Sequence, residues 1–140
     1  MAEKSIERRL CLRFKLPGAT VSIKKIGLFG GRKKVIEDFC PVLDMSRGGI
    51  RFLTQKLLPF RSRVEVQLCA PGESVPLRLI GRVIWASFNP GKSYKFQAGI
   101  KFNPYGQEKN HNDPSVLTKI MSLEEKFPEP GDSAGTECPD

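Results

Sequence analysis

The sequence predicts an all-β domain of about six antiparallel strands, followed by one C-terminal helix. Short segments rich in β-branched and aromatic residues alternate with turns rich in glycine and proline, which is the pattern of an antiparallel sheet. Only the last apolar segment has the spacing of an amphipathic helix. Spaced short strands of this kind are typical of a sandwich or a small barrel. A closed barrel would leave no exposed strand edge.

Six segments have the composition or the alternation of strands. Segment 63–70 is the clearest, because Val64, Val66 and Leu68 alternate with polar residues as a half-buried strand requires. Segment 94–103 alternates in the same way. The other predicted strands are 12–23, which Pro17 and Gly18 interrupt, and 34–45, 49–54 and 75–88.

The helix is predicted at about residues 113–127. Asp113 can cap its N-terminus, and Pro114 suits the first helical position. Five apolar residues then recur at helical spacing, so one face can pack against the strands: Val116, Leu117, Ile120, Leu123 and Phe127. Beyond it, residues 128–140 are acidic and rich in Pro, Gly and Ser, and we expect a disordered tail. Residues 1–10 have few apolar anchors and are predicted to be a flexible basic segment, which leaves 11–127 as the domain.

The composition favours a single intracellular domain. A chain of 140 residues has the size of one domain. It contains no apolar run long enough for a membrane span, and its charged N-terminus lacks a signal peptide, so we expect a cytoplasmic protein. The four cysteines, Cys11, Cys40, Cys69 and Cys138, are widely spaced and form no CxxC pair, and the one histidine, His111, lies far from most of them. We therefore expect free thiols and no metal site.

The net charge of +8 is concentrated near the N-terminus. Residues 1–36 contain ten Lys or Arg and two acids, so 10 − 2 = +8, whereas the other 104 residues contain thirteen of each, so 13 − 13 = 0. A local excess of this kind favours an anionic partner such as a nucleic acid, a nucleotide or a membrane surface. A solvated basic edge is an equally good explanation of the charge alone.

Three arginines lie in the segment IERRLCLRF, residues 6–14. Arg9 and Arg13 are four residues apart, and Arg8 lies beside Arg9. A guanidinium group is planar, permanently charged and forked, so it can hold a phosphate with two hydrogen bonds and can also bind the O6 and N7 of guanine. The segment is therefore a candidate anion site, although an RxxxR pattern is common by chance.

A rarer pattern, DMSRGG, separates two predicted strands at residues 44–49. A [DN]xSxxG pattern is expected only roughly 0.06 times by chance in such a chain. The Asp44 carboxylate can accept the hydrogen bonds that guanine N1–H and N2–H₂ donate, and the Ser46 hydroxyl can donate or accept. Gly48 and Gly49 permit a positive φ and a close approach of the backbone to a ligand. The alternative is that Asp44 and Ser46 only cap a turn with their own side chains.

The two patterns together resemble the PilZ domain family over about residues 6–103, and the strands GIRF and FQAGIKF that follow are also similar to that family. The resemblance implies a six-stranded antiparallel β-barrel with a C-terminal helix and, as the ligand, cyclic di-GMP. It implies that the arginines grip the phosphates and guanines and that the acid, hydroxyl and glycine line the base pocket. The implied ligand residues are Arg9, Arg13, Asp44, Ser46 and Gly49, with Arg8 and Gly48 at flanking positions.

We expect a receptor rather than an enzyme. No nucleophile with its base, no P-loop and no cluster of metal ligands can be assembled, so the ligand would be bound and not turned over, with no cofactor. Binding would order the N-terminal segment onto the barrel and offer a downstream protein a new surface. Two alternatives remain: a small β-barrel that binds nucleic acid through its basic segment, and a PilZ-like adaptor that binds only protein. The basic connection at residues 24–34 extends the site, faces a partner, or is simply a charged surface loop without a role in binding.

Overall fold

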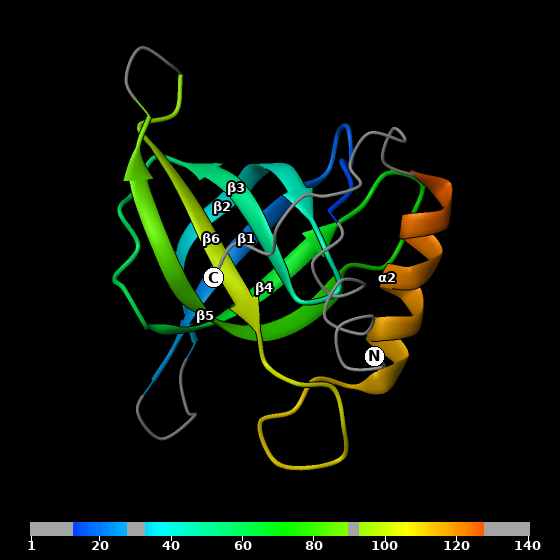
Figure 1. The fold of residues 1–140 in the computed structure, drawn as a ribbon. Coiled ribbons are helices and arrows are strands. Elements are labelled where there is room, and N and C mark those ends of the chain that lie inside the picture. Colours follow the sequence, from blue (N-terminus) through cyan, green and yellow to red (C-terminus); the bar gives the residue numbers. More distant parts are fainter. Residues whose placement is uncertain (1–12, 28–32, 90–92, 128–140) are drawn as a thin grey trace, which may run out of the picture.

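The computed structural model describes residues 13–27, 33–89 and 93–127. Six antiparallel strands close into a barrel with the order β1-β2-β3-β6-β5-β4 (Figure 1). The prediction of a six-stranded antiparallel barrel with a C-terminal helix is therefore confirmed. The strands are β1 (Thr20–Ile26), β2 (Lys33–Met45), β3 (Gly49–Thr54), β4 (Arg63–Cys69), β5 (Leu77–Phe88) and β6 (Phe96–Phe102).

The predicted strand boundaries agree closely with the structure except at the first strand. The predicted strand 12–23 is wrong at its start, because β1 begins only at Thr20. Pro17 has no backbone N–H to donate, and Gly18 adopts a φ of 85°, which ends extended structure before β1 begins. Phe14 forms an isolated antiparallel bridge with Met45 instead.

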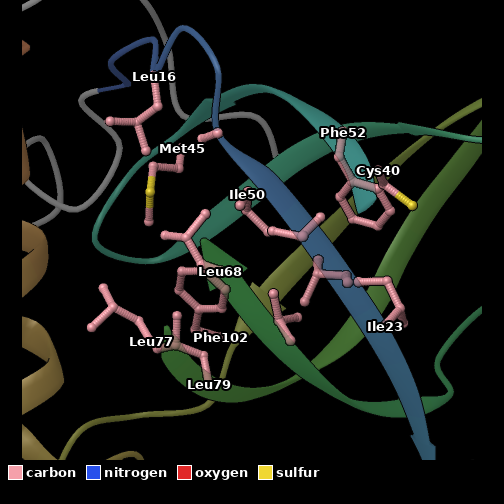
Figure 2. Close-up of a cluster of buried hydrophobic side chains, with 14 of the residues drawn as sticks. Leu16, Ile23, Cys40, Met45, Ile50, Phe52, Leu68, Leu77, Leu79 and Phe102 are labelled. Carbon is pink, nitrogen blue, oxygen red and sulfur yellow. The ribbon is translucent and has the colours of Figure 1, made fainter. Parts of the chain in front are cut away.

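The alternating apolar residues of all six strands fill the barrel with one hydrophobic core. Val64, Val66 and Leu68 of β4 are fully buried, as their alternation predicts. Figure 2 shows side chains from several strands meeting in the interior, among them Ile50 and Leu79. Because alternate residues of a strand point to opposite faces, the polar residues between these positions point to the outer face of the barrel, where Glu65 is nevertheless buried.

Helix α2 (Pro114–Lys126) stands beside the barrel in Figure 1. Asp113 caps it by accepting a hydrogen bond from the Ser115 backbone N–H (2.9 Å), and this bond lowers the pKa of the Asp113 carboxyl. Ile120 and Leu123 are buried, and the Lys126 ammonium lies 4.0 Å from the carboxylate of Glu73 in the β4–β5 connection. The predicted cap and apolar face are confirmed. Within the described ranges, no helix is long and apolar enough to cross a membrane.

Two of the four cysteines lie in the described residues, and both are free thiols, as predicted. Cys40 is buried on β2, and Cys69 is exposed at the end of β4. Burial, together with the nearby Glu37 carboxylate, raises the pKa of the Cys40 thiol to about 12. The predictions for Cys11 and Cys138, for the flexible segment 1–10 and for the tail 128–140 lie outside the described residues.

Candidate functional site

A pair of backbone hydrogen bonds joins the segment before β1 to the end of β2. The Phe14 N–H donates to the Met45 carbonyl (2.9 Å), and the Met45 N–H donates to the Phe14 carbonyl (3.0 Å). This bridge holds Arg13 beside Asp44, so that Arg13 Nη1 donates to Asp44 Oδ1 at 2.9 Å. The structure thus brings together one residue from each of the two patterns that the sequence singles out.

Asp44 also binds a second guanidinium, that of Arg51 on β3, its partner in the strand register. Arg51 Nε donates to Oδ1 (2.9 Å) and to Oδ2 (3.1 Å), and Arg51 Nη2 also donates to Oδ2. These hydrogen bonds raise the pKa of the Arg51 guanidinium. Asp44 is only 6% exposed, so one nearly buried carboxylate is shared by two cations. The cluster keeps one surplus positive charge, which suits an anionic ligand.

Arg13 has a side-chain N–H that donates to no acceptor among the described residues. Its Nε is buried and has no hydrogen-bond partner among the described residues. A buried N–H without an acceptor is costly, and such groups are uncommon in folded proteins. The unused donor leaves this guanidinium able to bind one more acceptor.

Ser46 shapes the turn between β2 and β3 with its own side chain. Its Oγ accepts a hydrogen bond from the Gly48 N–H (3.2 Å), and its backbone N–H donates to the Gly49 carbonyl (2.8 Å). Ser46 therefore caps the turn, and its hydroxyl hydrogen is left free to donate to another group. The turn-capping alternative is wrong for Asp44, whose carboxylate binds the two arginines instead.

The two glycines of the pattern do not adopt a positive φ, which among the described glycines occurs only at Gly18 and Gly72. A Cβ on Gly49 would lie 2.6 Å from the carbonyl oxygen of Ile100 on the neighbouring strand β6. Gly49 is thus required by close strand packing rather than by its backbone angles.

The turn is also anchored to helix α2. Arg47 Nε and Nη2 donate to the two carboxylate oxygens of Glu124, each at 3.1 Å. The Tyr105 hydroxyl donates to the Arg47 carbonyl (2.6 Å), and burial raises the pKa of this phenol. These contacts fix the position of the Asp–Ser–Gly turn relative to helix α2.

An aromatic side chain extends the cluster along the outer surface of the barrel. Arg51 pairs with Gly99, and Gly99 pairs with Trp85. A Cβ on Gly99 would collide with the indole ring, so the Trp85 ring lies across the glycine. Trp85 lies two strands from Arg51 and is half-buried, and its ring offers a flat apolar surface over the intervening strand β6.

A pocket of about 530 Å³ lies beside the cluster, between the segment before β1 and the outer face of β2, β3 and β6. This volume is in the range of small-molecule sites. Its lining residues are Lys15, Leu16, Pro17, Val42, Leu43, Asp44, Arg51 and Gln97.

The sequence matches the PilZ domain family over residues 8–112. The chain belongs to the PilZ domain family. PilZ domains are cyclic di-GMP-binding receptor domains and not, in general, enzymes. A comparison with curated proteins found no match. The matched region spans both patterns and all six strands, so the family assignment covers the whole barrel.

The predicted ligand residues of this PilZ domain fall into two groups. Arg13, Asp44, Ser46, Gly48 and Gly49 lie at one place, where the segment before β1 meets the β2–β3 turn. Arg8 and Arg9 lie outside the described residues. Sequence reasoning missed two residues of the candidate site, and their signals were weak. One is Arg51, which lies between two buried residues of β3. The other is Trp85, and a tryptophan in a strand normally indicates a core residue.

Proposed function

We propose that this PilZ domain is a receptor for cyclic di-GMP that relays the signal to a partner protein. The observation that supports the proposal best is the cluster in which Asp44 is shared by Arg13 and Arg51, with Trp85 nearby on the same surface. The carboxylate suits the N–H donors on the edge of guanine, the surplus positive charge suits the phosphates, and the flat aromatic ring suits the face of the base.

The chemistry assigns one role to each group. The Asp44 carboxylate accepts hydrogen bonds from guanine N1–H and N2–H₂, and the Ser46 hydroxyl adds a donor at the floor of the turn. Arg13 binds a phosphate, with Arg8 and Arg9 as the other phosphate ligands. Trp85 stacks on a guanine ring. The base and the phosphates are then bound by different parts of the same cluster.

The two arginines around Asp44 play different parts in this exchange. Arg13 gives the carboxylate one hydrogen bond, whereas Arg51 gives it bonds from two nitrogens. A two-pronged guanidinium–carboxylate contact is stronger and better oriented than a single bond. Arg13 is therefore the group that moves to the ligand phosphate, and Arg51 keeps the carboxylate oriented toward the guanine edge.

Release of Arg13 from Asp44 links ligand binding to the N-terminal segment. Arg13 directly precedes Phe14, whose backbone is fixed to Met45, and residues 1–12 follow in the N-terminal direction. A ligand whose phosphates bind Arg8, Arg9 and Arg13 draws residues 1–12 onto the barrel. The ordered segment then presents the downstream protein with a surface that the free receptor does not offer.

Hydrogen exchange with and without cyclic di-GMP tests the proposal. Saturating ligand should slow the exchange of backbone amides in residues 1–13 and in residues 44–51, because both segments contact it. Single-stranded decathymidine serves as the comparison, since the nucleic-acid alternative predicts protection by the oligonucleotide that weakens steeply with salt.

The outcomes separate the receptor from its mechanism. Protection of residues 44–51 alone would support cyclic di-GMP binding but reject the ordering of the N-terminal segment. Unchanged exchange throughout at saturating cyclic di-GMP would reject the receptor. Protection by decathymidine but not by cyclic di-GMP would favour the nucleic-acid-binding alternative.

A further inference from the structure

Three cations stand side by side across three strands of the barrel. Arg63 of β4 pairs with Arg82 of β5, and Arg82 pairs in turn with Lys101 of β6. Residues that face each other in this way have their side chains on the same side of a sheet, only about 5 Å apart at Cβ. Like charges placed directly opposite are destabilising, so the barrel carries this basic row at a cost.

The basic row faces outward. The next residues along the three strands, Val64, Val83 and Ile100, are all buried, so Arg63, Arg82 and Lys101 lie on the opposite, outer face. Arg82 and Lys101 are exposed and Arg63 is half-buried. The charges are therefore available to a partner in solution.

Two of these guanidinium groups are held in fixed positions. Arg82 Nη1 donates to the Arg61 carbonyl (3.2 Å), and Arg63 Nη2 donates to Asn110 Oδ1 (3.1 Å). Arg61 adds a fourth cation, with its Cζ 5.2 Å from the centre of the Phe60 ring. Phe60 is 64% exposed, so the row ends in an exposed aromatic residue covered by an arginine.

Within the described residues, no carboxylate forms an ion pair with the row. In the part of the chain that the structure describes, none of Arg61, Arg63, Arg82 and Lys101 forms an ion pair with a carboxylate. Residues 37–140 contain thirteen basic and thirteen acidic residues, 13 − 13 = 0, yet the fold gathers four of the bases on one surface. The net charge of zero over residues 37–140 therefore gives no sign that positive charge is concentrated on this surface.

We propose that the basic row is the docking surface for a partner protein that presents a cluster of carboxylates. Charge complementarity selects an acidic partner. Three arginines, one lysine and an exposed aromatic residue match the composition of protein interfaces, which are enriched in arginine and aromatic residues. A nucleic acid strand fits less well, because the three paired strands that carry Arg63, Arg82 and Lys101 span only about 10 Å, and Arg61 covers one face of the Phe60 ring.

The docking surface adjoins the proposed ligand site. Lys101 is two residues beyond Gly99 on β6, and its partner Gly49 is two residues before Arg51 on β3, which corresponds to about 7 Å along each strand. A partner on the basic row would thus lie beside bound cyclic di-GMP. The proposal therefore identifies the downstream partner of the receptor as a protein with an acidic surface, and it rests on the proposed receptor function.

A labelled decaglutamate peptide is the probe for the surface, followed by fluorescence anisotropy at low and moderate salt without cyclic di-GMP. The double variant Arg63→Gln/Arg82→Gln should bind the peptide about tenfold more weakly than the native protein. The matched control Lys56→Gln/Lys119→Gln removes two exposed charges elsewhere and should change the affinity by less than about twofold. Lys101→Gln, at an exposed site, should weaken binding by itself and serves if the double variant fails to fold.

Four results would overturn the proposal. They are no peptide binding by the native protein, an equal loss in the control variant, tighter binding of decathymidine than of decaglutamate, and a loss of cyclic di-GMP affinity in Arg63→Gln/Arg82→Gln. The last would place the row in the ligand site itself. Because the peptide measurement uses no cyclic di-GMP, a failure of the receptor proposal is seen separately.

Discussion

An Asp44→Ala variant should bind cyclic di-GMP at least about 100-fold more weakly than the native protein. The guanine edge loses the carboxylate that accepts its two donors, and each hydrogen bond to a charged group contributes roughly 1.5–3 kcal/mol. The variant should also unfold more easily. Arg13 and Arg51 lose their shared partner, and since they are 18% and 38% exposed, water compensates only in part. Calorimetric titration and urea unfolding measure the two effects.

Two further variants, one at Asp44 and one control elsewhere on β2, test whether the effect depends on the charge of Asp44. Asp44→Asn keeps the side-chain volume and one oxygen acceptor, so it should stay folded and still lose most of the ligand affinity. Asp38→Ala removes an exposed acid on the same strand and should leave both properties unchanged. Native-like affinity in Asp44→Asn would show that the carboxylate is structural and not a ligand group.

Gly49→Ala should destabilise the barrel by about 3 kcal/mol, because a single methyl group there meets the backbone of β6 rather than a movable side chain. The Ile100 carbonyl oxygen lies 2.6 Å from the position of the new Cβ. Relief of this clash requires β3 and β6 to separate at Gly49, where the β2–β3 turn ends. Thermal or urea unfolding of the variant measures the loss.

Gly72→Ala is the matched control for this prediction. Gly72 has a φ of 82° but no atom within 4 Å of its added Cβ, so the substitution costs only backbone strain, about 1 kcal/mol. Equal stability losses in the two variants would mean that the clash with Ile100 is relieved cheaply and that the barrel is more pliable than its close packing indicates.

The fold was predictable because the alternation of apolar residues in the strands and the capping signals of the helix all indicate the same architecture. Val64, Val66 and Leu68 alternate cleanly, and Asp113 and Pro114 are strong signals for the start of a helix. The first strand was misplaced because composition does not show that the Pro17–Gly18 turn separates a one-residue bridge from a full strand.

The candidate site was predictable only where its residues form a rare pattern. Arg13 and Asp44 belong to such patterns, and the structure joins them. Arg51 was missed because an outward-facing arginine on a strand is ordinary in sequence, and only the register with Asp44 shows its importance. Trp85 was missed because its position depends on a glycine in another strand, Gly99.

The basic row could not be predicted from the sequence either. Arg63, Arg82 and Lys101 lie far apart in the sequence, and sums over segments assign the excess charge to the N-terminus. Their alignment depends on the pairing of three strands, which no local pattern encodes.

The single tryptophan, Trp85, gives the most direct test of whether a guanine nucleotide binds at the Asp44 cluster. Titration with cyclic di-GMP should change its fluorescence emission in a saturable manner, because a guanine stacks on the indole, and the change should disappear in Asp44→Asn. Emission that stays constant to saturating ligand, or that changes equally in Asp44→Asn, would contradict binding at this site.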